Sequence, residues 1–172
     1  MEGTFIAVGN SHHKFDRLFS ELPTFLKLLP QPVVIQCGHN SFLSHEATVI
    51  PFVEMDEFSS FLENSSLVII HGGAGSIIQA LRANKIPLVV PRRKFFDEHV
   101  DDHQYELSRE LSRLNRIIMI ESPSEITQNV SKVLEFQKTY PRSFSNPNGL
   151  MRSISNSLDS LANLSNIDQS NN

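Results

Sequence analysis

Six short apolar runs recur along the first 120 residues, and segments of mixed polarity separate them. Within runs such as SLVII and IPLVV, apolar residues follow one another directly instead of alternating with polar residues. Such runs are typical of strands buried on both faces, and helices connect such strands in parallel sheets. The sequence therefore predicts an α/β fold, a doubly wound parallel sheet with right-handed crossovers. The expected strands cover residues 4–9, 32–38, 47–52, 66–70, 86–90 and 116–120.

The segments between the apolar runs carry apolar residues at helical spacing. The segment 14–29 is expected to form a helix that breaks or restarts at Pro23, because proline cannot donate a backbone hydrogen bond. Residues 122–137 open with a serine cap and a proline in the first turn, which is typical of a helix start. The other expected helices cover residues 55–65, 76–84 and 99–114.

We expect residues 1–138 to form a single domain and residues 139–172 to form a tail. Half of the last 30 residues are Ser or Asn, a composition typical of disordered segments. The tail also carries an apolar stripe, which predicts an amphipathic helix near residues 150–164 that packs on its own domain or on a partner chain. The stripe consists of Leu150, Ile154, Leu158, Leu161 and Leu164.

The composition argues against several classes of function. A net charge of -4 without a clustered basic face argues against binding of nucleic acid. Cys37 is the single cysteine, so no internal disulfide can form and a reducing compartment is expected. The first residues show no leader pattern, and no apolar run reaches the roughly 18 residues of a spanning helix. We therefore expect a soluble protein that contacts a membrane only indirectly.

The turn HGGAGS, residues 71–76, holds three of the seven glycines between an expected strand and an expected helix. Ligands of open α/β sheets bind beyond the carboxyl ends of the strands, where helix N-termini present free N–H groups. Small residues let an anion such as a nucleotide diphosphate approach those groups, although glycines also suit a sharp turn with no ligand. A second turn, GNSHH at residues 9–13, should open on the same edge. Neither turn matches the dinucleotide-binding or P-loop pattern.

A third polar segment follows the expected strand at 86–90 and should reach the same edge. His99 and His103 are four residues apart there, but no third metal ligand has a suitable spacing, so we predict no metal and no other cofactor. The polar residues that crowd this helix start are Glu98, His99, Asp102, His103 and Gln104.

The chain resembles the C-terminal domain of family 28 glycosyltransferases over about residues 4–120. The resemblance rests on the segments VGNSHHKFDRLF, VVIQCG, LVIIHGGAGSIIQAL, IPLVVPR and EHVDDHQYEL, in this order. The chain is similar in particular to stand-alone versions of that domain, which are the catalytic subunits of two-chain enzymes. The resemblance implies the Rossmann-like donor half of a GT-B glycosyltransferase that inverts the anomeric centre.

The resemblance also implies substrates and partners. The donor would be a UDP-sugar, and a separate membrane-anchored subunit would hold the acceptor, a polyprenyl-linked sugar. The chain would then work in the cytoplasm, at the membrane face, through that partner. The segment EHVDDHQ favours exopolysaccharide or capsule synthesis. The alternatives are a UDP-GlcNAc transferase subunit of dolichol-linked oligosaccharide synthesis, a non-catalytic scaffold subunit, and a sugar-modifying enzyme that works alone.

Residue by residue, the resemblance assigns the donor contacts to three turns. Residues 73–76 would bind diphosphate through backbone amides, and residues 9–11 would face the phosphate or the sugar. His103 and Gln104 would reach sugar hydroxyls, and Gln79 stands where relatives often carry an acidic residue that binds the ribose. The donor-binding candidates are Gly9, Asn10, Ser11, His71, Gly72, Gly73, Ala74, Gly75, Ser76, Gln79, Glu98, His99, His103 and Gln104.

Sugar transfer needs a base for the acceptor hydroxyl, and the family takes this base from the acceptor half. His12 and His13 are the local candidates, since imidazole titrates near neutral pH. His71 is expected to hold the glycine turn by hydrogen bonds, with a direct donor contact as the alternative. Arg92 and Arg93 would either add charge-assisted bonds to phosphate or form a solvated cationic loop.

Overall fold

The structure is a computed structural model, and it describes residues 3–139. These residues form one six-stranded sheet in the order β3-β2-β1-β4-β5-β6, and every neighbouring pair of strands is parallel. The predicted α/β class with a parallel sheet is therefore confirmed. The strands are β1 (Thr4–Ala7), β2 (Val33–Gln36), β3 (Thr48–Ile50), β4 (Leu67–His71), β5 (Leu88–Val90) and β6 (Ile118–Met119).

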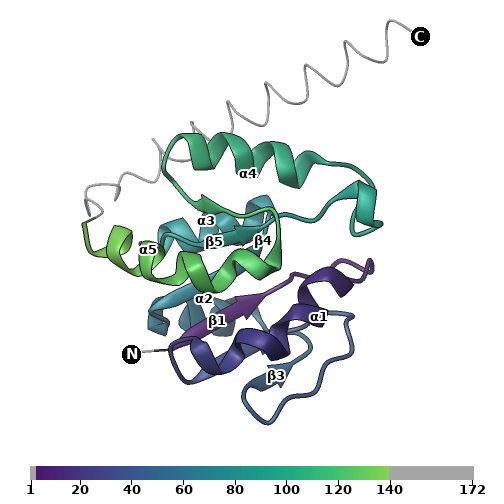
Figure 1. Ribbon diagram of the computed structural model, residues 1–172, viewed down its shortest axis with the longest axis horizontal. Coiled ribbons are helices and arrows are strands. Elements are labelled where there is room, and N and C mark those ends of the chain that lie inside the picture. Colours follow the sequence, from purple (N-terminus) through teal and green to yellow (C-terminus); the bar gives the residue numbers. More distant parts are fainter. Residues whose placement is uncertain (1–2, 140–172) are drawn as a thin grey trace, which may run out of the picture.

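Five α-helices within residues 3–139 cover the two faces of the sheet, and Figure 1 shows α4 on one side with α1 and α5 on the other. Helices α1 and α5 pack on one face, against strand residues such as Ile6, Ile35 and Ile69. Helices α2, α3 and α4 pack on the opposite face, around Phe5 and Ile70. The helices are α1 (Asp16–Phe25), α2 (Met55–Asn64), α3 (Ala74–Arg82), α4 (His103–Arg113) and α5 (Ile126–Thr139).

The centre of the sheet explains why the strands read as continuous apolar runs. Strand β1 pairs with β2 on one side and with β4 on the other, and all four of its residues are buried. Phe5 is fully buried and stacks on Phe61 of α2, with ring centroids 5.0 Å apart. Burial of one such side chain contributes about 1.5–3 kcal/mol. A strand in this position has no face on which polar side chains could alternate.

The strand order changes direction between β1 and β4. From β1 the chain builds outward through β2 and β3, and it then returns to β4 and builds outward through β5 and β6. The connections after β1 and β4 lead to helices on opposite faces, α1 and α3. Such a switch point leaves a crevice at the carboxyl ends of the strands, and this is where ligands of open α/β sheets bind.

Two helices differ from the prediction. The helix expected to break or restart at Pro23 instead runs through it to Phe25 and then tightens into a 3-10 turn at residues 26–28. Pro23 lies on the exposed side while Leu22 and Phe25 are buried, so packing of the buried side outweighs one missing hydrogen bond. The helix expected over 99–114 begins only at His103. The turn before it contains Asp97 in the left-handed region, at φ 56°.

The predicted tail, with its amphipathic helix near 150–164, lies outside the described residues except for Thr139. Within residues 3–139, no helix combines the length and the apolar character needed to cross a bilayer.

Candidate functional site

A cavity of about 330 Å³ opens at the switch point, between the carboxyl ends of β1 and β4. This volume falls in the range of about 300–1,000 Å³ that is usual for small-molecule sites. The turn after β1, the turn after β4 and the beginning of α2 form its walls. Its lining residues are Gly9, Asn10, Gln36, Val53, Met55, Phe58, His71, Gly73, Gly75, Ser76 and Gln79. Seven of these eleven residues belong to the predicted donor-binding set.

The N-terminus of α3 points its free amides at this cavity. Gly73 is the N-cap, and no side chain caps the helix. The first helical hydrogen bond runs from the Ile77 amide to the Gly73 carbonyl. The amides before Ile77 in the first turn therefore have no hydrogen-bond acceptor within the helix. With the helix dipole, these N–H groups make a ready site for an anionic oxygen.

His71 closes the inner end of the cavity. Its ring is buried, and Nδ1 lies 3.4 Å from the Ala7 carbonyl oxygen, to which it donates. A Cβ on Gly9 would lie 2.6 Å from His71 Cε1, and a Cβ on Gly73 would lie 2.3 Å from Nε2. Burial, together with the positive charge of Arg92, lowers the pKa of His71 to about 4. The ring is therefore neutral at pH 7 and fits between two turns that only glycine allows to approach so closely.

Gln36 fixes the turn after β1 from the neighbouring strand. Its Oε1 accepts from the Gly9 amide at 3.0 Å, and its Nε2 donates to the carbonyls of Gly9 and Pro51 at 3.1 and 2.9 Å. Gly9 adopts φ 72°, a conformation that favours glycine. The backbone at the cavity wall is therefore held by a buried amide side chain.

One wall of the cavity is apolar and the other is polar. Val53, Met55 and Phe58 form the apolar side, next to Gln79. The Gln79 amide nitrogen lies 3.7 Å from the Met55 sulfur. Among residues 3–139, no Lys, Arg, Asp or Glu lines this cavity, so the polar groups that it offers are amides, a hydroxyl and a neutral imidazole.

The predicted residues at 98–104 lie in the adjacent loop and at the start of α4, outside the cavity lining. Glu98 is buried, and its carboxylate accepts from Arg17 and from the Arg93 amide. His99 and His103 both approach the carboxylate of Asp101, at 2.9 and 3.2 Å. No group of three or more His, Cys, Asp or Glu side chains in residues 3–139 is placed to hold a metal ion.

Gln104 is the member of this segment that lies nearest the glycine turn. A Cβ on Gly72 would lie 2.9 Å from the Gln104 carbonyl oxygen, so α4 begins directly against that turn. The side-chain oxygen of Gln104 accepts from the Arg92 amide at 3.3 Å. The three predicted segments, 9–13, 71–76 and 98–104, therefore meet at one edge of the sheet.

The histidines after β1 face a second, neighbouring cavity of about 640 Å³. His13 Nδ1 donates to the Asp97 carbonyl at 3.1 Å, and the Ser11 hydroxyl accepts from the His13 amide. His12 is exposed and lies against His39, with ring centroids 4.3 Å apart and the ring planes tilted by 35°. Ala74, the remaining predicted residue, packs on the core beneath α3.

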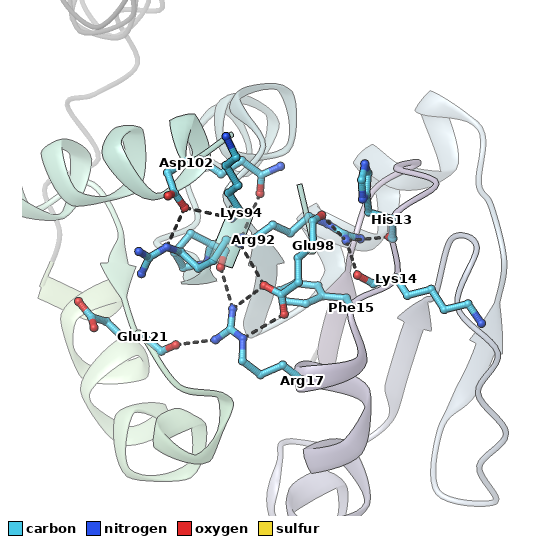
Figure 2. A network of polar contacts seen from close by, with 12 residues as sticks. His13, Lys14, Phe15, Arg17, Arg92, Lys94, Glu98, Asp102 and Glu121 are labelled. Carbon is cyan, nitrogen blue, oxygen red and sulfur yellow. Dashed lines mark hydrogen bonds and ion pairs between the residues drawn. The ribbon is translucent and has the colours of Figure 1, made fainter. Parts of the chain in front are cut away.

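Neither of the expected roles describes Arg92, which is fully buried. Its guanidinium donates to backbone carbonyls instead of facing phosphate or solvent, and Figure 2 shows it between the loops after β1 and β5. Arg93 is partly exposed, pairs with Asp102 at 2.9 Å and lies over the Tyr105 ring. The expectation of two phosphate-binding or solvated arginines is therefore wrong for Arg92.

Sequence reasoning also missed part of the cavity wall. Gln36 carries a signal in the sequence, because a glutamine interrupts the apolar run PVVIQCG. Val53, Met55 and Phe58 carry no such signal, since apolar residues near a helix start are ordinary core residues. Their position at the cavity depends on where β3 pairs with β2.

The chain matches the model of the glycosyltransferase family 28 C-terminal domain over residues 4–156. It is similar to the UDP-N-acetylglucosamine transferase subunit ALG13 of Debaryomyces hansenii, with 33% identity over 111 residues, 62% of this chain and 50% of the relative. The protein of the same name from Candida albicans is 33% identical over 94 residues, 55% of this chain and 30% of the relative. The chain thus spans half or less of the length of these curated relatives.

Solved structures share the fold at low sequence identity. CalG4, the calicheamicin glycosyltransferase, superposes with a TM-score of 0.59 at 16% identity, over 95% of this chain and 44% of CalG4. MurG of Acinetobacter baumannii gives a TM-score of 0.55 at 21% identity, over 78% of this chain and 44% of MurG. A solution structure of ALG13 gives 0.52 at 18% identity, over 77% of this chain and 87% of that one.

Proposed function

Because the chain belongs to the glycosyltransferase family 28 C-terminal domain family, we propose that it is the donor-binding subunit of a UDP-sugar transferase. The observation that carries this proposal is the uncapped N-terminus of α3 at a cavity on the switch point of the sheet. Free amides suit the diphosphate, and the apolar wall at Val53, Met55 and Phe58 suits a planar base.

In the proposed reaction, an acceptor hydroxyl attacks the anomeric carbon of the sugar. The bond from that carbon to the diphosphate oxygen breaks, and UDP leaves with the electron pair. The amides of the first turn of α3 are fixed in place before the reaction, so they stabilise the negative charge that develops on the leaving oxygen. No cationic side chain is required in the cavity for this step.

The hydroxyl proton must pass to a base, and His13 is the base that we propose within this chain. The Asp97 carbonyl can only accept a hydrogen bond, so Nδ1 of His13 carries the proton and Nε2 of the neutral ring is an acceptor. The ring faces the second cavity, beside the donor site. A base from a partner subunit is the alternative.

We propose a membrane-anchored, acceptor-binding partner because exposed apolar side chains gather at this edge. Eight large apolar side chains are exposed among residues 3–139, and five of them lie in the two segments 51–55 and 91–100 that follow β3 and β5. Patches of this kind mark interaction sites. The relatives are themselves named as subunits. The five side chains are Phe52, Met55, Phe95, Phe96 and Val100.

For the donor, we propose UDP-GlcNAc, with a polyprenyl-linked sugar as the acceptor. The names of the Debaryomyces hansenii and Candida albicans relatives support this donor. Those relatives give no support to exopolysaccharide or capsule synthesis, the assignment favoured from the sequence. The alternative of a UDP-GlcNAc transferase subunit therefore takes its place.

Substitution of Gly75 tests the donor site with a matched pair. A Cβ at Gly75 meets no other atom within 4 Å, so Gly75→Asn and Gly75→Asp should both fold normally. Both side chains would enter the cavity, but only Asp places a negative charge beside the diphosphate. We expect the unaltered chain to bind UDP in isothermal titration, and Gly75→Asp to bind about tenfold more weakly than Gly75→Asn.

Uridine, which lacks the diphosphate, is the control ligand and should not distinguish the two variants. Equal UDP affinity for Asn and Asp would contradict an anion site at α3. Absence of any UDP affinity of the unaltered chain at millimolar nucleotide would refute the proposed function.

A further inference from the structure

Arg92 donates hydrogen bonds to two loops that are far apart in the sequence. Its Nη1 donates to the carbonyls of His13, Lys14 and Glu98 at 2.9, 3.2 and 3.2 Å. Its Nη2 donates to the Val8 carbonyl at 3.1 Å. The same guanidinium lies over the Phe15 ring, with 4.6 Å from Cζ to the ring centroid. One side chain thus links residues 8–15, after β1, to the loop after β5.

A second set of hydrogen bonds, made by Arg17, joins the chain after β1 to the loop after β5, as Figure 2 shows. Arg17, in the first turn of α1, donates to both carboxylate oxygens of Glu98, at 3.0 and 2.9 Å. It also donates to the Pro91 carbonyl at 2.9 Å and to the Glu121 carbonyl. Glu98 is 3% exposed and Arg17 is 17% exposed in their side chains. Arg17 therefore holds the loop after β5 at Pro91 and at Glu98.

Both linked loops flank the donor cavity. The Val8 carbonyl that Arg92 holds directly precedes Gly9, which lines the cavity. The Arg92 amide binds the side chain of Gln104, and α4 there begins against Gly72. Arg92 itself does not line the cavity. Its contacts thus act on the segments next to the cavity walls and not on a ligand.

Resting on the function proposed above, we propose that Arg92 is the positioning residue of the site. Its buried guanidinium fixes the loop after β1 against the loop after β5, and this keeps the turn at Gly9 and the glycine turn beside α4 in one geometry for the donor. The ion pair of Arg17 and Glu98 holds the loop after β5 in this position.

A buried guanidinium is costly, and this cost argues for a specific role. Burial lowers the pKa of Arg92 to about 10, while the negative charge of Glu98 acts against this shift, so the side chain stays charged at neutral pH. Its Nε has no hydrogen-bond partner in the described part of the chain. Only a planar fork reaches four carbonyls at once, whereas the ammonium of lysine is a single point with three donors. Charge alone does not account for arginine here.

Three conservative variants of the full chain test this role. Arg92→Lys keeps the charge but loses the planar guanidinium, and Arg17→Lys weakens only the second set of hydrogen bonds, made by Arg17. Arg113→Lys is the matched control, because Arg113 is 72% exposed on α4 and pairs only with Glu110 among the contacts described. The readouts are amide hydrogen exchange along the chain and UDP affinity by isothermal titration.

We expect Arg92→Lys to exchange faster at residues 8–15 and 93–98, with α5 unchanged, and to bind UDP about tenfold more weakly. Arg17→Lys should accelerate exchange mainly at 93–98, and Arg113→Lys should match the unaltered chain. If Arg92→Lys fails to fold, the local effect of Arg17→Lys carries the test.

Three results would overturn the inference. They are unchanged exchange in both loops, faster exchange across the whole sheet, and looser loops with unchanged UDP affinity. If the unaltered chain binds no UDP although the loops loosen in Arg92→Lys, the loop coupling stands and the proposed function is what fails.

Discussion

The imidazole of His71 acts as a spacer between two backbone turns. It touches both Gly9 and Gly73 at distances that leave no room for a Cβ, and it donates to the Ala7 carbonyl of the adjacent strand. A charged ring in this place would be buried next to the Arg92 guanidinium, which is why its pKa falls to about 4. The packing of the cavity floor thus depends on a neutral histidine.

This residue makes stability depend on pH in a defined direction. The folded-state pKa of about 4 lies below the ordinary 6.5, so the unfolded chain takes up the proton first as the pH falls. The stabilisation is complete above about pH 6.5 and is lost progressively toward pH 4. Between pH 7.5 and pH 5 the loss from this group is about 2 kcal/mol.

We expect His71→Asn to lose about 2 kcal/mol less stability than the unaltered chain over that pH interval. Urea unfolding of both proteins at pH 7.5 and pH 5 measures this difference. Parallel losses in the two proteins would mean that His71 is not buried as a neutral ring.

At the scale of elements, α1 shows how packing decides where a helix ends. Leu18, Phe19, Leu22 and Phe25 are buried on one side, while Pro23 faces solvent. The helix therefore continues through a residue that cannot donate to the carbonyl one turn earlier. Part of the packing energy offsets this defect.

Pro23→Ala should remove the defect and raise the free energy of unfolding by about 1–2 kcal/mol, after allowance for the greater freedom of the unfolded chain. Urea denaturation measures the change. Pro30→Ala is the matched control, because Pro30 lies outside every helix and offers no such gain. A loss of stability in Pro23→Ala would show that the proline is favoured where it stands.

The strands could be predicted from the sequence, whereas the start of α4 could not. All six strands described fall on the expected apolar runs, and the central strands β1, β4 and β5 are almost entirely apolar because both of their faces are covered. The start of α4 does not follow from local composition, since Glu98 turns inward to meet Arg17, which is 81 residues away in the sequence. The helical periodicity of the sequence includes residues 99–102, and nothing in it indicates that Glu98 pairs with Arg17.

At the candidate site, too, some features could be predicted from the sequence and others could not. The glycine turn at 71–76 and the turn at 9–10 are visible because each directly follows an apolar run. The role of Arg92 is hidden, since PRRKFF reads as a surface loop and four of the partners of Arg92 are backbone carbonyls, which every residue carries. Hydrogen bonds to the main chain leave no pattern in the sequence of the partner.

At the scale of the whole molecule, the two edges of the sheet differ. The carboxyl edge carries the two cavities described above and the exposed side chains of Phe52, Met55, Phe95, Phe96 and Val100. Leu28 and Leu114, by contrast, lie in connections that lead into β2 and β6 at the amino edge. Apolar area is therefore concentrated where a partner is proposed to bind.

We expect the isolated chain to self-associate through the carboxyl edge when no partner covers it. Phe95→Ser removes a side chain that is 84% exposed and should lower the concentration-dependent light scattering of the chain. Leu28→Ser is the matched control, with 69% exposure at the opposite edge, and should leave the scattering unchanged. Equal effects of the two substitutions would mean that apolar exposure in general, and not this edge, drives association.

The groups at α3 that are proposed to bind the anion belong to the main chain, and this limits how substitutions can change the site. A substitution in the first turn of α3 changes the shape of the space where the phosphates are proposed to bind. It removes no backbone N–H donor unless the new residue is proline. If the proposed donor site is right, substitutions of side chains that line the cavity, such as Met55 and Gln79, can change nucleotide and sugar preference while the backbone donors to the diphosphate stay in place.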